Sequence, residues 1–228
     1  MPLAAFLITE IMPLDEPVQI GLILPSAAAG APFLPKLAAT AKGNLAFSVG
    51  LMVLLMVVTV GFAPIVLPLL IPGVAVNPWD IARPLITIML IPLAIGLFVK
   101  AWTPDMAGSL APIMNQTSGS SLIAMGVLVL LVGYQELLAA VGTGAFVAAT
   151  LMIGGALLTG LLLSSGGSAN LSVMGLGTGQ RNISAALLVA TTNFTDPEVI
   201  LTVLVGSVVG LVILFLAAGT LGKRAAPT

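Results

Sequence analysis

The chain has 228 residues, of which 59% are hydrophobic and 7% are charged. Soluble domains carry about 25% charged residues, so this chain has too little polar material to face water and is predicted to be an integral membrane protein. Its net charge of −1 excludes a nucleic-acid-binding protein, because such proteins need a basic face. The sequence has no cysteine and no histidine, which excludes thiolate chemistry, disulfides and imidazole-based catalytic or metal sites.

The acidic residues do not cluster along the chain. They lie beside breaks between apolar segments, at Asp15, Glu16, Asp80, Asp105, Glu136, Asp196 and Glu198. An intramembrane acid protease would need two carboxylates near the middle of the bilayer, and these positions do not provide them. We therefore expect no enzymatic activity, no catalytic residue, no metal site and no cofactor.

Apolar segments long enough to cross a bilayer, which takes about 20 residues, follow one another along the chain. Residues 1–14 are too few and are interpreted as the end of a helix that begins upstream. About seven full spans follow, given the same length criterion. They are residues 17–40, 45–71, 81–101, 120–134 (starting as early as 113), 146–163, 171–194 and 199–221.

The basic residues predict how the chain is oriented. Alternating the spans across the bilayer gathers most of them on one side, namely Lys42, Lys100, Lys223 and Arg224. The other side receives Arg83 alone, together with most of the acidic residues. Because Lys and Arg in short loops mark the cytoplasmic face, we expect a cytoplasmic C-terminus and a protein of the cell (inner) membrane.

Two of the spans contain helix-breaking residues. In residues 25–32, Pro25 is expected to stop a helix and Pro32 to begin the next one. In residues 175–182, three glycines at alternate positions disfavour helix by about 1 kcal/mol each, and Asn182 is a good N-cap for a new helix. Irregular backbone inside a membrane must be buried in protein or line a watery cavity. Both spans are therefore predicted to be broken helices beside a binding site.

The positions of the two breaks match those of an inverted repeat of five helices, as in many secondary transporters. The predicted fold is thus all-helical, with two broken helices that cross. Residues 1–14 would end a truncated third helix, 15–72 would complete the first repeat, and 79–224 would form the second repeat, with its broken helix at 171–194. The two second half-helices would aim their N-terminal ends, each about half a positive charge, at the centre.

Arg181 is the ionisable residue expected near the bilayer centre. Burying it costs about 2.5 to 3.5 kcal/mol, so a functional role is the default. Its five donors suit a carboxylate or a sulfonate. The alternative is a structural clamp, in which the guanidinium binds loop carbonyls. Additional hydrogen bonds to a substrate are expected from Thr178, Gln180, Asn182 and Ser26.

Other polar residues are given structural roles. Lys36 is expected near the cytoplasmic end of its half-helix, where its long side chain would reach the membrane surface; the alternative is that it lines the pore. Ser118, Ser120 and Ser121 are expected to cap a helix.

Three stretches of the sequence resemble the bile acid:sodium symporter family. They are residues 41–44, residues 46–49 with prolines at 64 and 68, and residues 179–187, which are similar to the family's Gly-x-Gln-Asn signature. The resemblance implies ten helices in two inverted repeats, with a core of crossing broken helices and a panel that moves against it. It also implies transport of bile acids or other organic anions, in most members with two sodium ions.

The residues that the resemblance assigns to sodium are largely replaced. Ser48 matches a hydroxyl ligand, but Met52 stands where Thr is usual. The first broken helix offers only backbone oxygens, the family's sodium-binding carboxylate falls on Gly177, and Arg181 stands where Gln is usual. Hard cations prefer several oxygens, usually with a carboxylate. Our hypothesis is that Arg181 supplies permanently the positive charge that sodium supplies elsewhere, so that transport is sodium-independent.

The sequence therefore predicts a secondary transporter of an organic anion that works by alternating access. One alternative is a cation/proton antiporter of similar fold, which would need a carboxylate near the bilayer centre. Another is a truncated fragment or membrane scaffold that does not transport. The expected partners are the organic anion and the lipid bilayer, and the sequence leaves the substrate, the coupling ion and the oligomeric state open.

Overall fold

A computed structural model describes residues 1–71, 77–132, 134–165 and 167–225, and the regular structure in these ranges is helical. The helices are α1 (Pro2–Ile11), α2 (Glu16–Ala27), α3 (Leu34–Thr40), α4 (Leu45–Leu70), α5 (Pro78–Pro84), the π-helix η1 (Leu85–Leu90), α6 (Ile91–Trp102), α7 (Pro104–Val132), α8 (Tyr134–Ala139), the 3₁₀-helix η2 (Ala140–Thr143), α9 (Ala145–Leu163), α10 (Ser168–Gly179), α11 (Ile183–Asn193) and α12 (Pro197–Arg224).

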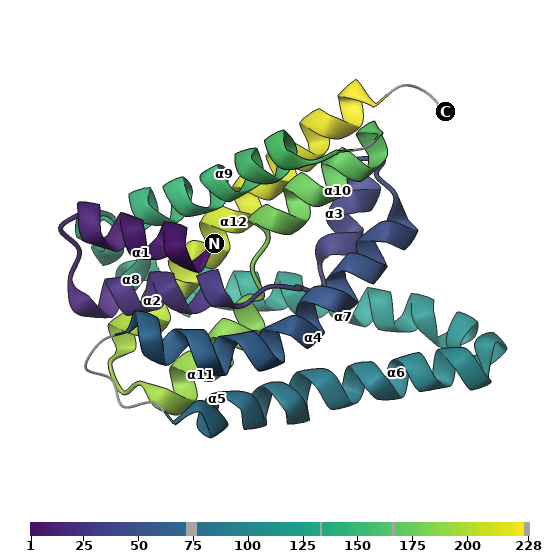
Figure 1. Cartoon of the computed structure of the whole chain (residues 1–228), viewed down its shortest axis with the longest axis horizontal. Helices are drawn as coiled ribbons and strands as arrows, with labels where there is room; N and C mark the ends of the chain where they lie inside the picture. Colours follow the sequence, from purple (N-terminus) through teal and green to yellow (C-terminus); the bar gives the residue numbers. More distant parts are fainter. Residues whose placement is uncertain (72–76, 133, 166, 226–228) are drawn as a thin grey trace.

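Four helices in the described ranges are long and apolar enough to cross a bilayer: α4, the continuous helix Pro78–Trp102, α9 and α12. Their bounds lie within a few residues of the predicted spans. Two further predicted spans are each divided into two helices, α2 with α3 and α10 with α11. Figure 1 shows α9, α10 and α12 packed side by side, with α2 and α3 against them. The hairpin of α6 and α7 extends beyond the rest of the bundle.

The first break lies later in the chain than predicted. The expectation that Pro25 stops the helix is wrong, because α2 continues through it to Ala27. Pro25 removes one i→i−4 hydrogen bond, and α2 tolerates this loss for two further residues before it ends. The second half-helix also begins later, at Leu34, and Pro35 rather than Pro32 occupies its first turn. There the missing N–H of proline would have had no partner.

The second break is shorter than predicted. Gly175, Gly177 and Gly179 all lie within α10, and the break is confined to residues 180–182. The glycines were expected to disfavour helix, but here they permit close packing. A Cβ at Gly179 would lie 2.9 Å from Cδ2 of Leu214 in α12, and one at Gly175 would overlap the side chain of Leu161 in α9. Close contact with two neighbouring helices offsets the low helix propensity of glycine.

The helix α7 begins well before the predicted start at residues 113–120. Pro104 opens it, which is favourable at a helix start, and Asp105 in the first turn complements the helix dipole. The predicted capping role of Ser118, Ser120 and Ser121 is wrong, because these residues lie in the interior of the 29-residue helix. Glu136 belongs to α8, and its side chain lies outside the described part of the structure.

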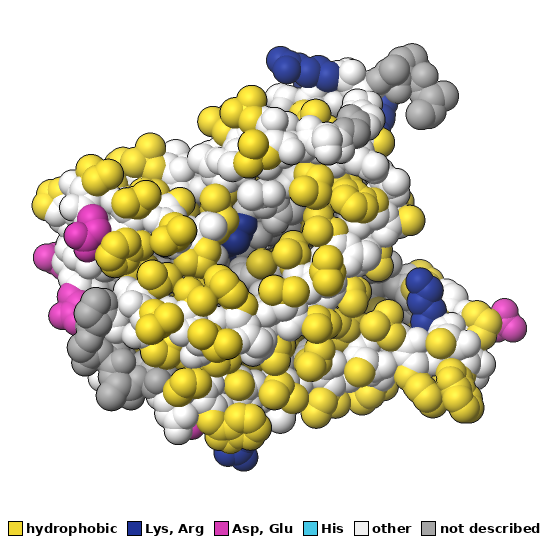
Figure 2. All heavy atoms as spheres, viewed as in Figure 1, with side chains coloured by type: hydrophobic (Ala, Val, Ile, Leu, Met, Phe, Trp, Pro, Cys, Tyr) yellow, Lys and Arg dark blue, Asp and Glu magenta, His cyan; other side chains and the backbone are white. Residues whose placement is uncertain are grey.

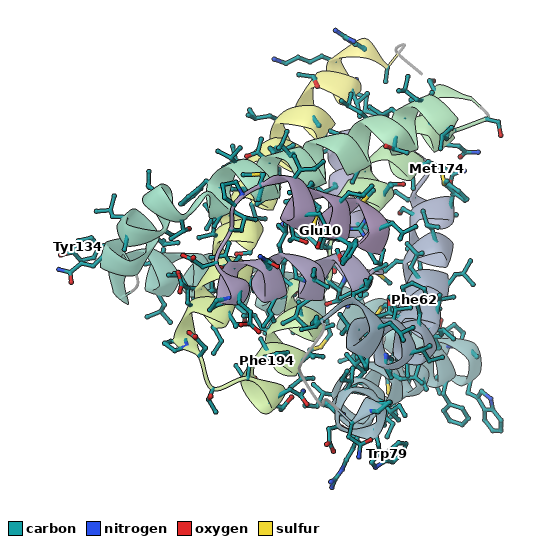
Figure 3. All side chains as sticks on the ribbon, turned by 60° about the vertical axis from the view of Figure 1, so that its left-hand side comes forward. Glu10, Phe62, Trp79, Tyr134, Met174 and Phe194 are labelled. Carbon is teal, nitrogen blue, oxygen red and sulfur yellow. The ribbon has the colours of Figure 1, made fainter. Side chains whose placement is uncertain are left out.

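The charged side chains gather at the two ends of the molecule. Figure 2 shows acidic groups mainly at the left and basic groups at the top, where α12 ends at Lys223 and Arg224, with further basic and acidic groups at the right edge and basic groups at the bottom. Glu10, an acidic residue that the predictions above leave out, is exposed in the last turn of α1 (Figure 3). Between the two ends the visible surface is mainly apolar. This distribution is that expected of a protein whose middle lies in lipid.

Candidate functional site

The two broken helices meet where their helical segments are interrupted. The backbone N–H of Asn182, in the second break, donates to the carbonyl oxygen of Ala28, in the first, at 2.9 Å. The side-chain Nδ2 of Asn182 donates to the carbonyl oxygen of Gly30 at 3.4 Å. These bonds occupy backbone groups that the interrupted helices cannot pair internally. The two interruptions are therefore joined directly by hydrogen bonds.

Asn182 also begins the helix that follows it. Its Oδ1 accepts a hydrogen bond from the backbone N–H of Ala185 at 3.1 Å, which confirms the predicted N-cap. Its Nδ2 donates to Sδ of Met89, in η1, at 3.1 Å. One buried amide thus connects the first break, α11 and the π-helical turn that leads into α6. Nothing in the sequence pattern pointed to Met89 as its partner.

Thr59 of α4 supports the first break. Its Oγ1 accepts a hydrogen bond from the backbone N–H of Ala29 at 3.0 Å and donates to the carbonyl oxygen of the same residue at 3.1 Å. The side chain is 2% exposed. A single hydroxyl therefore pairs both backbone groups of a residue that belongs to no helix. The sequence signal for this role is that Thr59 is one of two hydroxyl residues, with Ser48, in a mainly apolar span.

The guanidinium of Arg181 lies at the end of α2. Its Nη1 donates to the carbonyl oxygen of Ser26 at 3.4 Å, and Ser26 belongs to the last turn of α2. The C-terminal end of a helix carries about half a negative charge, so a cation is stabilised there. The contact that the structure gives Arg181 is therefore with a carbonyl at a C-terminal helix end.

A cavity of about 310 Å³, here called the Arg181 cavity, lies beside this contact. Its wall comes from the start of α1 with Met1, the end of α2, α4, α10 and the two breaks. Ser26, Thr178 and Arg181, three of the predicted substrate-binding residues, line it together. Phe62 and Met174, labelled in Figure 3, also line it. Figure 2 shows a hollow on this face of the molecule with a basic side chain at its floor.

The three hydroxyl groups that line this cavity all donate their protons to backbone carbonyl oxygens: that of Thr59 donates to Ala29, and the other two donate within their own helices. Oγ of Ser26 donates to the carbonyl oxygen of Ile23 at 2.6 Å, and Oγ1 of Thr178 donates to that of Met174 at 2.7 Å. Their oxygens keep lone pairs that can accept a hydrogen bond. The donors that an anion requires must therefore come from Arg181, whose guanidinium has five N–H groups.

Asn182 faces a different cavity from Arg181. This second cavity, the Asn182 cavity, also has a volume of about 310 Å³, and apolar side chains dominate its wall. Three methionines line it, Met52 and Met56 from α4 and Met89 from η1. Arg181 lines the other cavity, so the two neighbouring side chains face different sides of the break. The predicted substrate-binding residues are therefore divided between two cavities.

Two predicted residues line neither of these cavities. Gln180 is 6% exposed, and within the described residues its Oε1 has no hydrogen-bond partner. Ser48, the predicted hydroxyl ligand of a cation, is fully buried and donates to the carbonyl oxygen of Leu45 at 2.7 Å. Neither residue is therefore placed to contact a solute in either cavity.

The residues around Arg181 fit sodium poorly. Gly177, where the family's carboxylate falls, lines the same cavity as Arg181. Among the described lining residues of this cavity there is no carboxylate, and the one ionisable side chain is the guanidinium. A hard cation prefers several oxygens with a carboxylate and would be repelled by a fixed positive charge.

The family model described as the Sodium Bile acid symporter family matches residues 1–142. The match extends from α1 to η2 and ends before α9, so the second broken helix and Arg181 lie beyond it. No curated protein matches the chain. Together with the four apolar helices, the family match shows an integral membrane protein. The chain belongs to the sodium bile acid symporter family, whose members are secondary transporters and not enzymes.

Proposed function

We propose that the protein transports an organic anion by alternating access, with Arg181 as a fixed positive charge and without a requirement for sodium. The observation that supports this most directly is the position of the guanidinium. It lies at the crossing of the broken helices, donates to Ser26 and faces a cavity whose described lining has no other ionisable side chain.

The fold supports the transport mechanism. We infer that α2 with α3, and α10 with α11, each make one pass through the membrane, and that the two passes belong to an inverted repeat. In such transporters, irregular backbone at the bilayer centre forms the site around which the domains move. The basic residues at the end of α12 favour a cytoplasmic C-terminus in the inner membrane.

Arg181 can serve both the fold and the substrate. Its bond to Ser26 uses one N–H and places positive charge at the end of α2, where relatives are expected to use sodium. The remaining donors of the guanidinium can bind a carboxylate or a sulfonate bidentately. A bound anion would neutralise the buried charge, which should lower the cost of moving the loaded core across the bilayer.

The Arg181 cavity suggests the kind of anion. Its volume of about 310 Å³ is at the small end of the range for ligand pockets. Leu51, Leu55 and Val58 from α4 add an apolar wall opposite the charged group. We therefore propose a small organic anion that has one carboxylate or sulfonate on an apolar body.

The test combines binding with flux. Purified protein is screened by thermal shift against carboxylates and sulfonates with apolar bodies, with benzoate and taurocholate as small and large representatives. Uptake of the stabilising anion into proteoliposomes is then compared in sodium and choline buffers. We expect a stabilising anion, uptake of similar rate in both buffers, and loss of both signals in Arg181→Ala. Strong stimulation by sodium, or an unchanged Arg181→Ala, would contradict the proposal.

A further inference from the structure

The middle of α7 is polar. Residues 115–121 read Asn-Gln-Thr-Ser-Gly-Ser-Ser and are called here the α7 polar segment. They occupy the centre of a 29-residue helix, which is about 43 Å long at 1.5 Å per residue. The α7 polar segment would lie in the hydrocarbon if α7 crosses the bilayer, as the span predicted to start as early as residue 113 requires, although α7 is not among the four described helices that are long and apolar enough to cross. Polar side chains are tolerated at that depth when they face protein or water.

Lys36 of α3 approaches this segment. Its Nζ lies 3.6 Å from the position that a Cβ would occupy on Gly119. The same ammonium lies 5.5 Å from the ring centroid of Phe33, which in turn makes an edge-to-face contact with Phe215 of α12 at 5.4 Å. The expectation that Lys36 lies near the cytoplasmic end of its half-helix is wrong, because it is in the first turn of α3.

Helix geometry identifies the groups that lie beside the ammonium. Asn115 and Gln116 precede Gly119 by four and three residues, so all three residues share one face of α7. Both amides and the ammonium can donate hydrogen bonds to an anion. The nearest acidic residue before the segment in α7 is Asp105, about 20 Å away along the helix axis, so the local charge is positive.

This group of residues is separate from the two cavities at the crossing. Neither the Arg181 cavity nor the Asn182 cavity includes Lys36 or a described residue of α7. Apart from the partly buried Gly119, the residues of the α7 polar segment are exposed. Contact with lipid is costly for exposed polar residues beside a cation, whereas water or an anion can form hydrogen bonds with them.

We propose that Lys36 and the α7 polar segment line a water-filled path for anions between α3 and α7. The path would attract the carboxylate or sulfonate of the substrate before or after it occupies the crossing. The identity of the anion as the transported substrate rests on the proposed function. The path adds a second region that binds the same anion on its way to or from the Arg181 cavity.

The native chain has no cysteine, so single cysteines can be introduced without removing others. Gln116→Cys is treated separately with the anionic sulfonatoethyl and the cationic trimethylammonioethyl methanethiosulfonate. The labelling rate of each reagent is divided by the rate at which the same reagent reacts with a free thiol in solution, which corrects for its intrinsic reactivity. Leu110→Cys is the control for lipid exposure, because Leu110 is exposed and lies on the face opposite Gly119. We expect rapid labelling at position 116 with a preference for the anionic reagent, and little labelling at position 110.

The role of Lys36 is tested by changing its charge. In Lys36→Gln, the preference of Gln116→Cys for the anionic reagent should fall about tenfold, as expected for loss of a unit charge about 6 Å away in water. Lys36→Arg should keep the preference. Lys42→Gln, which removes an exposed cation from the loop after α3, is the matched control and should change nothing.

Each outcome decides the inference. Slow labelling at position 116, equal to that at position 110, would show that no water-filled path exists there. A preference that is unchanged in Lys36→Gln would show that the ammonium does not select anions. The assay needs no transported substrate, so it can fail while Arg181-dependent uptake succeeds, and the failures of the two proposals remain distinguishable.

Discussion

Asn182 donates its backbone N–H to the carbonyl oxygen of Ala28 at 2.9 Å, and this bond joins the two broken helices backbone to backbone. Because no side chain is needed for it, the crossing can persist when residues around it change. The side chain of Asn182 can therefore cap α11 and donate to Met89. The side chain of the preceding residue, Arg181, faces a cavity. The two broken helices are thus joined mainly by a backbone hydrogen bond, and the guanidinium of Arg181 is held beside this bond without being required for it.

Replacement of Asn182 by Ala should destabilise the protein more than loss of a helix cap alone. It removes the N-cap of α11 and the hydrogen bonds to Gly30 and Met89, so we expect a loss of about 2 to 3 kcal/mol. The control is Asn44→Ala, which removes only an exposed N-cap bond to Phe47 and should cost about 1 kcal/mol. Thermal melting in detergent gives the comparison. Equal shifts for both variants would show that the side-chain bonds across the crossing contribute nothing.

Replacement of Thr59 by Val should cost about 1 to 3 kcal/mol, because it leaves the backbone N–H and carbonyl of Ala29 without their partner. Valine has nearly the same shape, so packing is preserved. Thr150→Val in α9 is the matched control, since the Thr150 hydroxyl is exposed and bonds a carbonyl of its own helix. Chemical unfolding of both variants measures the difference. A Thr59→Val protein as stable as the wild type would mean that water replaces the hydroxyl.

Two glycines of α9 should respond to alanine with opposite signs. A Cβ at Gly160 would lie 2.7 Å from Cβ of Thr178 and 2.8 Å from the carbonyl oxygen of Met174, so Gly160→Ala should destabilise by about 1 to 3 kcal/mol. No atom lies within 4 Å of a Cβ at Gly154, so Gly154→Ala should stabilise by about 0.5 to 1 kcal/mol. Melting temperatures of the two variants test the packing of α9 on α10. Shifts of the same sign would contradict it.

Sodium dependence should be created by exchanging the charges in the Arg181 cavity. Arg181→Gln with Gly177→Glu removes the guanidinium and adds the carboxylate that a hard cation prefers. A side chain at position 177 meets Cδ2 of Leu51 at 3.1 Å and Cδ2 of Leu34 at 3.2 Å, flexible groups that can move by the small distance required. We expect sodium, compared with choline, to raise the melting temperature of the double variant but not of the wild type.

The control for this exchange is Gly177→Ala with Arg181→Gln, which introduces similar crowding without a carboxylate and should not respond to sodium. If the wild type is itself stabilised by sodium and not by choline, Arg181 does not stand in for the cation. If the double variant with Gly177→Glu does not respond to sodium either, the cavity lacks the remaining oxygen ligands. The positions of the carboxylate and of Arg181 are then not equivalent to those in relatives.

The amino-acid sequence by itself determined the class of the protein and the order of its helices. Hydropathy depends on local composition, so α4, α9 and α12 begin and end close to the predicted residues. Proline and glycine marked the two spans that are broken. The cap at Asn182 was also predictable, because an asparagine side chain reaches backbone groups only three residues away.

Only the tertiary structure decided where the breaks lie and what they face. Whether Gly175 breaks a helix or allows Leu161 to pack against it depends on how the preceding helix, α9, packs against α10. Arg181 and Asn182 are adjacent in the chain, yet they line different cavities, because the helices packed around the break decide what each side chain faces. The approach of Lys36 to Gly119 likewise depends on the fold, since contacts between distant segments do not follow from local propensity.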